Sequence, residues 1–166
     1  MTPGEPAIAG GFSVADAWRA LGLACKAVGL PAAGAELLRL GENALFHLPA
    51  PGVVVRIARS VDLLPDVQKE VAVARWLEAS DFPAVRLAHD VNQLLVIEGR
   101  VATFWQYIES AEAEPSLAEL GSILRRLHSL SLPVDVVLPA LDPLCRVRQR
   151  LIAANDARCL ELFQEP

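Results

Sequence analysis

The residues from Leu40 to Glu70, LGENALFHLPAPGVVVRIARSVDLLPDVQKE, decide the fold. They begin with a Gly-x-Asn turn, formed by Gly41 and Asn43, between two strand-like runs. Arg56 then interrupts an apolar strand, and Glu70 lies at the apolar side of the helix that follows. Because a helix packs its apolar side on a sheet, this order predicts a site in which one cation and one carboxylate meet.

Composition limits the classes of protein to which the chain can belong. Its 166 residues suit about one domain. Hydrophobic residues make up 53% of them and the net charge is -5, which is typical of a globular chain and not of a disordered one. A protein that binds nucleic acids without specificity needs clustered positive charge, and the sequence has no basic block. No apolar run could span a bilayer, and no signal peptide pattern precedes the first helix. We therefore expect a cytoplasmic protein with neither a nucleic acid nor a membrane as partner.

Cysteine and histidine usage argues against disulfides and zinc. Cys25, Cys145 and Cys159 are odd in number and far apart, so we expect free thiols in a reducing compartment. The three histidines do not combine with them at the spacing of zinc ligands. The sequence therefore predicts no structural metal.

Hydrophobic periodicity and turn residues predict an α+β fold. We expect helices at 14–28, 65–79 and 117–128 and another from Leu144 onward, and strands at 35–40, 44–48, 53–58, 85–87, 93–97 and 101–108. Ser13 would cap the first helix, Gly29 would end it, and Glu98-Gly99 would form the tight turn between the last two strands. The strands would form a mostly antiparallel sheet with a helix beside it, followed by a helical region. An acidic segment, 109–115, marks the boundary, so the expected parts are an N-terminal tail and helix at 1–34, a sheet domain at 35–108 and a helical part at 109–166.

The pairing of Arg56 with Glu70 is the first specific prediction. Strand alternation places Arg56 on the same sheet face as Val54 and Ala58, where its guanidinium could bind phosphate oxygens. Taken alone, a strand-end arginine that reaches solvent is the simpler interpretation. Glu70 beside the apolar stripe of its helix needs a partner, and Arg56 is the obvious one. The alternative is that Glu70 lies at the edge of the stripe and faces solvent.

The turn and the last strand supply the other candidate residues. Gly41 permits close approach of the main chain to a ligand, and the N–H groups of such a turn can hold a phosphate. An ordinary hairpin turn is the alternative for Gly41 and Asn43. The strand 101–107, VATFWQY, could offer main-chain groups and aromatic walls to a nucleobase. Its alternative is a core strand with large side chains.

Together these segments resemble the aminoglycoside phosphotransferase family, the small-molecule branch of the protein-kinase-like fold. The resemblance is carried by LGENALF (40–46), VVVRIAR (53–59), KEVAVARWL (69–77), EGRVATFWQY (98–107) and LGSILRRLH (120–128). It covers about Ala35 to Leu151. It implies a kinase-like N-lobe at 35–108, including the connector, followed at 109–166 by the first helices of an incomplete helical C-lobe.

The resemblance also implies roles in binding a nucleotide, namely ATP, with GTP as an alternative. The implied cofactor-binding residues are Gly41 and Asn43 in the phosphate-covering turn, Arg56 as the phosphate-contacting cation, Glu70 as its helix partner, and Phe104, Trp105, Gln106 and Tyr107 in the adenine-binding connector. Arg56 stands where the wider fold usually has lysine. Because arginine is a planar fork and lysine a point charge, the phosphate geometry would differ.

The family's catalytic loop, H-G-D-x-x-x-x-N, does not occur in these residues. His89-Asp90 has the wrong spacing and precedes the connector. We therefore assign no catalytic base and no metal ligand, although the intact enzyme would use Mg²⁺. Because phosphoryl transfer needs base, cation and metal together, we expect no activity from this chain alone.

Three functional hypotheses remain open. The first is the N-terminal part of an ATP-dependent kinase that phosphorylates a hydroxyl of an unknown small molecule. The second is a non-catalytic kinase-fold module that binds a nucleotide or a protein partner, and the gene sequence beyond Pro166 would distinguish it from the first. The third is an unrelated α+β domain whose Arg56 and Glu70 are surface charges. From Ser116 onward, helices with apolar stripes lack partners, so we expect self-association there or loose order. The alternative is a compact monomer in which these helices fold back onto the sheet.

Overall fold

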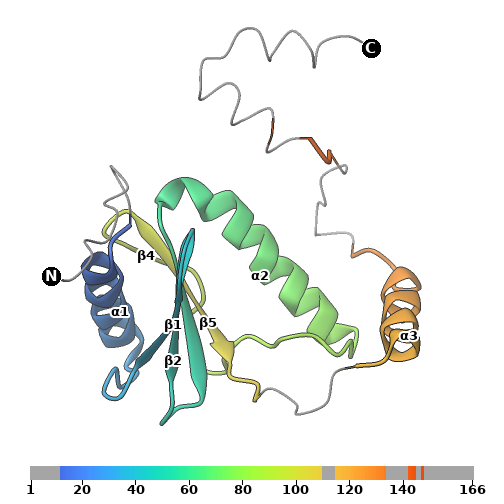
Figure 1. The fold of residues 1–166 in the computed structure, drawn as a ribbon, viewed down its shortest axis with the longest axis horizontal. Coiled ribbons are helices and arrows are strands. Elements are labelled where there is room, and N and C mark those ends of the chain that lie inside the picture. The colour runs from blue at the N-terminus through green and yellow to red at the C-terminus, as the bar shows by residue number, and fades with distance from the viewer. Residues whose placement is uncertain (1–11, 110–114, 134–141, 145–146, 148–166) are drawn as a thin grey trace, which may run out of the picture. The chain divides into compact units, whose positions relative to one another are not determined.

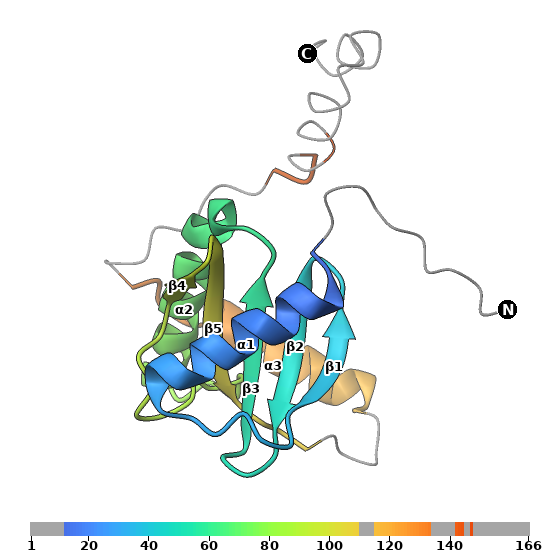
Figure 2. The same ribbon diagram turned by 90° about the vertical axis from the view of Figure 1, so that its left-hand side faces the viewer.

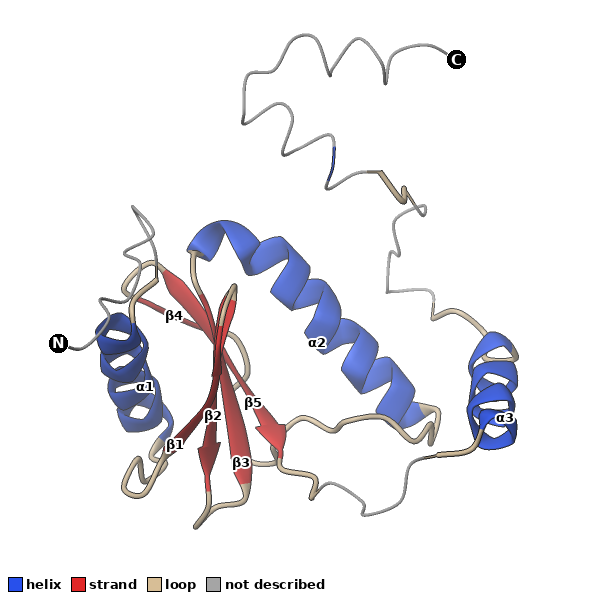
Figure 3. Cartoon of the chain, viewed as in Figure 1, coloured by secondary structure: helices blue, strands red, loops and turns tan. Residues whose placement is uncertain are grey.

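The computed structural model describes residues 12–109, 115–133, 142–144 and 147 (Figure 1). Residues 12–109 and 115–133 belong to one unit, Met1–Val136, and the others to a second, Val137–Pro166. The first unit contains a five-stranded antiparallel sheet with helices, the α+β arrangement expected from the sequence (Figure 3). No helix among the described residues is long and apolar enough to cross a membrane.

The sheet has the strand order β1-β2-β3-β5-β4. Its strands are β1 (Glu36–Leu40), β2 (Asn43–Leu48), β3 (Val53–Ala58), β4 (Leu95–Ile97) and β5 (Arg100–Gln106). A tight hairpin joins β4 to β5 through Glu98 and Gly99, whose φ angles of 46° and 72° suit a two-residue turn of the primed type. The sequence predicted this turn.

Register divides the central strands into two faces. Residues directly opposite each other share a face, and Leu45 lies opposite Arg56 while Val54 lies opposite Trp105. One face, called the α1 face here, carries Ala44, Phe46, Leu48, Val53, Val55, Ile57, Ala102 and Phe104, all buried. The other, the α2 face, carries Asn43, Leu45, His47, Val54, Arg56, Ala58, Val101, Thr103 and Trp105.

Helix α1 (Val14–Val28) covers the α1 face and crosses its strands (Figure 2). Its buried side is short-chained, with Ala17, Ala20, Leu21, Ala24 and Cys25, so the helix packs closely on the sheet. Ser13 caps the N-terminus and Gly29, at φ 73°, ends the helix in the left-handed conformation, as the sequence predicted.

An ionic network joins α1 to the β4–β5 hairpin. The Nε of Arg19 donates a hydrogen bond of 2.9 Å to Glu98, and Arg100 lies 3.7 Å from the carboxylate of Asp16. The Arg100 guanidinium also lies 5.0 Å from the ring centre of Phe12. These contacts fix one end of α1 at an edge of the sheet.

Helix α2 (Leu64–Ala79) lies on the opposite side of the sheet from α1 (Figure 1). It buries Val67, Val71 and Ala74 at helical spacing, which is the predicted stripe. A short 3-10 helix, η1 (Val61–Leu63), precedes it, and Ser60 caps η1. Glu70 sits beside the stripe and faces the sheet.

Helix α3 (Leu117–His128) forms where the sequence predicted it, capped by Ser116. Its apolar stripe is exposed, and Leu117 keeps 87% of its surface accessible. Arg126 contacts the end of α2, donating 2.5 Å to the carbonyl oxygen of Asp81 with its guanidinium 5.8 Å from the ring centre of Phe82. Covering of the stripe by another copy of the chain stays a prediction.

Some expected elements differ from the structure. The expected strand at 85–87 forms only an isolated bridge between Leu87 and Trp105, because main-chain pairing there is limited to hydrogen bonds on either side of these two residues. The strand expected at 93–97 begins at Leu95, since Leu94 takes a φ of 67° that a strand cannot contain. The helix expected from Leu144 onward lies largely outside the described residues, and Cys145 and Cys159 lie wholly outside them. Cys25 is a buried free thiol.

Candidate functional site

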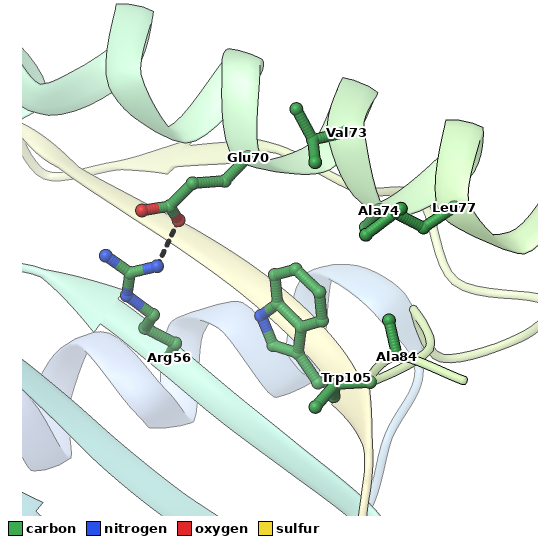
Figure 4. Close-up of a pocket in the computed structure, with 8 residues that line it drawn as sticks. Arg56, Glu70, Val73, Ala74, Leu77, Ala84 and Trp105 are labelled. Carbon is green, nitrogen blue, oxygen red and sulfur yellow. Dashed lines mark hydrogen bonds and ion pairs between the residues drawn. The ribbon is translucent and has the colours of Figure 1, made fainter. Parts of the chain in front are cut away.

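Arg56 and Glu70 form the ion pair that the sequence predicted. The Nη1 of Arg56, from β3, donates a hydrogen bond to the Oε2 of Glu70, from α2 (Figure 4). The Arg56 side chain is 25% exposed and that of Glu70 42%. Solvent therefore reaches both groups, and the remaining guanidinium nitrogens can bind an anion without first breaking the pair.

A pocket of about 320 Å³ lies beside this pair, between the sheet and α2. Its walls are Arg56, Glu70, Val73, Ala74, Leu77, Ala84, Val85 and Trp105. Figure 4 shows the α2 residues on one side, the Trp105 indole on the other and the ion pair at one end. The indole is fixed because its Nε1 donates a hydrogen bond of 2.9 Å to the Thr103 hydroxyl. The pocket thus combines an apolar wall with one accessible cation.

Only Trp105 of the four predicted connector residues lines this pocket. Phe104 is fully buried on the α1 face. Its N–H donates to Oε1 of Gln93 at 3.0 Å, and its carbonyl oxygen accepts from Gln93 at 2.9 Å and from the N–H of Ala88 at 3.0 Å. Phe104 therefore presents no side chain to the α2 face, and its main-chain groups already have partners.

Gln106 and Tyr107 also have their N–H groups engaged. The N–H of Gln106 donates to the carbonyl of Arg86 at 2.9 Å, and that of Tyr107 to the carbonyl of Gly52 at 2.8 Å. The Gln106 side chain shares the α1 face with Val53 and reaches the carbonyl of Leu87 at 3.2 Å. Recognition of a nucleobase by the N–H groups of these two residues would require breaking existing hydrogen bonds.

The Gly-x-Asn turn connects β1 to β2 as predicted. The N–H of Gly41 donates to the carbonyl of Asn43 at 3.0 Å. A Cβ added at Gly41 would meet no atom within 4 Å, and its φ is not left-handed, so the protein's own packing does not require glycine there. The Asn43 side chain does not bond its own main chain, because its Oδ1 is buried without a partner. The protein's own contacts explain neither the glycine at position 41 nor the buried amide oxygen of Asn43. Contact with a bound ligand would account for both.

One aromatic contact on the α2 face was not predicted from the sequence. The rings of His47 and Tyr107 stack with their centres 3.8 Å apart and their planes at 20°. Nδ1 of His47 lies 3.8 Å from Oε2 of Glu36 on β1. Because Leu45 lies opposite Arg56, strand alternation places His47 on the α2 face. The position of Tyr107 depends on how the chain leaves β5, which no local sequence pattern predicts.

Acidic residues do not gather into a metal site in the described ranges. Within them, no group of three or more His, Cys, Asp or Glu side chains is placed to hold an ion. The described part of the chain thus offers a partly exposed guanidinium beside an apolar pocket, and a stacked ring pair.

Comparison with known proteins identifies the family. A model of the phosphotransferase enzyme family matches residues 39–164, about three quarters of the chain. The chain belongs to this family. Among solved structures, it is similar to the aminoglycoside phosphotransferase APH(3'')-Id of Streptomyces rimosus, with a TM-score of 0.61 and 18% identity. That match covers 83% of this chain and 52% of the other, so the chain spans about half the length of that phosphotransferase. No curated protein matches the chain.

The structural match shows a kinase-like fold, of which this chain contains about half. The expected fold class and the family resemblance are therefore confirmed. The matched family region begins at residue 39, after α1, so the helix on the α1 face precedes the segment that the family model describes.

Proposed function

We propose that this chain supplies the nucleotide-binding lobe of an ATP-dependent small-molecule phosphotransferase. Residues 35–108 would form that lobe and residues 109–166 the beginning of a helical lobe, in the cytoplasm. The observation that carries the proposal is the partly exposed Arg56–Glu70 pair beside an apolar pocket, in a chain of this family. The acceptor would be a hydroxyl of a small molecule, and GTP is the alternative to ATP.

Each residue has a defined part in this proposal. Arg56 binds phosphate oxygens through the guanidinium nitrogens that Glu70 leaves free, and Glu70 holds the arginine in place. The turn at Gly41 lets main-chain N–H groups approach the phosphates. Mg²⁺ in the intact enzyme would neutralise phosphate charge. Because the described residues contain no ligand cluster for it, no step is assigned to this chain through the metal.

A non-catalytic nucleotide-binding module is the second candidate. The sequence contains no His-x-Asp-x-x-x-x-Asn, which the family's catalytic loop resembles, so these residues do not include a base for phosphoryl transfer. Both candidates require Arg56 to bind phosphate. They differ in whether the 166-residue chain turns over ATP, and we expect that it does not.

Thermal unfolding with and without nucleotide tests the shared step. Binding at a ligand concentration 100 times Kd stabilises a protein by about 2.7 kcal/mol, which raises Tm measurably. ATP should raise Tm of the wild type and of Arg59→Ala, a nearby exposed arginine after β3, but not of Arg56→Ala. If ATP leaves Tm of the wild type unchanged at millimolar concentration, the chain is not a nucleotide-binding lobe. ATP turnover that is lost on Arg56→Ala would refute the expectation of inactivity.

A further inference from the structure

We propose that the outer edge of β1 is a self-association surface, to which β1 of a second copy of the chain adds as an antiparallel strand. The two strands are related by a twofold axis at Leu37, and Glu36 of each copy pairs with Arg39 of the other. The inference goes beyond the proposed function, because it concerns neither Arg56 nor the pocket beside it.

The strand β1 forms an open edge of the sheet. It stands first in the strand order β1-β2-β3-β5-β4, and within the described residues β2 is the one strand that pairs with it (Figure 2). An edge strand presents unpaired N–H and C=O groups, to which another strand can add. Charged side chains and bulges are common devices against such pairing. Since β1 contains both, their arrangement decides whether this edge repels or accepts a strand.

A bulge in β1 places two opposite charges on one face. The register with β2 shifts between Leu37 and Arg39, so that Glu36 lies opposite His47 and Arg39 lies opposite Leu45. His47 and Leu45 are alternate residues of β2, and both belong to the α2 face. Without the bulge, residues three apart in a strand would point to opposite faces. Glu36 and Arg39 therefore lie on the same face, one on either side of Leu37.

This arrangement is self-complementary. A twofold axis at Leu37 brings the residue before it in one copy opposite the residue after it in the other. Because the bulged Leu38 is left out of the register, Glu36 faces Arg39 of the second copy, and symmetry makes the pair occur twice. Opposite charges that face each other across two strands are stabilising, and like charges are destabilising. Both side chains are exposed, that of Glu36 by 66%, so neither has to leave a buried contact to form the pair.

Apolar side chains extend the surface on the other face. Leu37 lies opposite Phe46, and the ring of Trp18 on α1 packs edge-on against Phe46 with the ring centres 4.8 Å apart. Trp18 is 40% exposed, Val14 one turn earlier is 39% exposed, and the bulged Leu38 is 52% exposed. Pairing about Leu37 places the two copies of this leucine opposite each other beside these side chains. A strand of five residues buries little area, so the dimer is a weak and reversible one.

Charge exchange tests the register, with the full 166-residue chain in sedimentation velocity over about 1 μM to 1 mM protein. Glu36→Arg places two arginines opposite each other twice in a dimer, and Arg39→Glu does the same with glutamates. The loss of two ion pairs alone should raise the dimer Kd about 2- to 30-fold in each variant. An equimolar mixture of the two variants restores both ion pairs in the mixed dimer, whose Kd should return to that of the wild type.

Three control variants separate the register from general effects of charge. Glu36→Arg combined with Arg39→Glu keeps both ion pairs in the dimer and should associate as the wild type does. Glu109→Arg and Arg59→Glu make the same changes of charge at exposed positions outside β1 and should leave the dimer Kd unchanged. ATP should raise Tm equally in all these variants and in the wild type, because pairing at β1 leaves Arg56 free.

The possible results are distinguishable. If the wild type stays monomeric over the whole series, the inference fails, while the effect of ATP on Tm still decides the proposed function. If the wild type dimerises without regard to the β1 charges and Leu120→Ser or Leu124→Ser abolishes the dimer, the apolar stripe of α3 is the surface and the inference fails. If both single variants weaken the dimer and their mixture does not restore it, Glu36 does not face Arg39 and the inference fails as well. Restoration in the mixture supports the proposed register.

Discussion

The ion pair between Arg56 and Glu70 makes a quantitative prediction about stability. Removing one partner of a fully buried pair costs about 3–5 kcal/mol, and an exposed pair contributes about 0–1 kcal/mol. The two side chains are 25% and 42% exposed, so solvent screens the pair and replaces the lost partner. We therefore expect a coupling free energy of about 1 kcal/mol between Arg56→Gln and Glu70→Gln. For a domain of this size, that corresponds to a Tm change of about 2–4 °C.

A double-mutant cycle by urea unfolding measures this coupling. It should be performed at low ionic strength and in 1 M NaCl, where the screening length falls to about 3 Å and the coupling should shrink. Asp66 and Lys69, 3.0 Å apart on α2, provide a control pair with an expected coupling of about 0.2–0.5 kcal/mol. A coupling above 3 kcal/mol, or one that salt leaves unchanged, would show that the pair is desolvated and would refute the reasoning from exposure. A coupling equal to that of the control pair would show that the contact is a surface pair only.

Three further predictions concern the turn, the first helix and the third. Gly41→Ala should leave the unfolding free energy within about 0.5 kcal/mol, since nothing lies near the added Cβ, yet weaken ATP binding in a titration; Gly52→Ala, at φ 63°, should cost about 1 kcal/mol or more. The pKa of Asp16 is lowered from 3.8 by hydrogen bonds from the Ser13 hydroxyl and N–H and then by Arg100 and Arg19. The contribution of Asp16 to stability is therefore present above about pH 3.8 and is lost as the pH falls further. Asp16→Asn should flatten this part of the profile of unfolding free energy against pH, measured by circular dichroism. Arg126→Ala should lower hydrogen-exchange protection of α3 and Arg125→Ala should not, and equal effects would mean that the contact with Asp81 does not hold the helix.

The parts that sequence predicted are those governed by local rules. Strand alternation gave the face of Arg56, and helical spacing gave the side of Glu70, so their meeting followed from the packing of one helix on one sheet. The Glu98–Gly99 turn and the Ser13 cap likewise depend on neighbouring residues only.

The features of the fold and of the candidate site that could not be predicted from the sequence depend on contacts between segments far apart in the chain. Gln93 binds both main-chain groups of Phe104 across 11 residues of sequence, which removes Phe104 from the candidate site. Tyr107, which follows β5, reaches His47 on β2 across the intervening strand β3, and no spacing rule relates the two residues. The aromatic run 104–107 therefore looked like one wall, whereas the fold sends its side chains to different places.

Because side chains alternate between the two faces of the sheet, an odd or even residue number predicts how a position in β2 or β3 responds in a saturation mutagenesis scan. In β2 the odd-numbered residues face α2, and in β3 the even-numbered ones do, so the phase reverses across the hairpin at 49–52. When a scan is scored once for protein abundance and once for ligand retention, the sensitive positions should form two alternating patterns, displaced from each other by one residue. Deleting one residue of β3 before Arg56 would exchange the two patterns downstream of the deletion, so that Arg56 would move to the apolar α1 face and Ile57 would take its place.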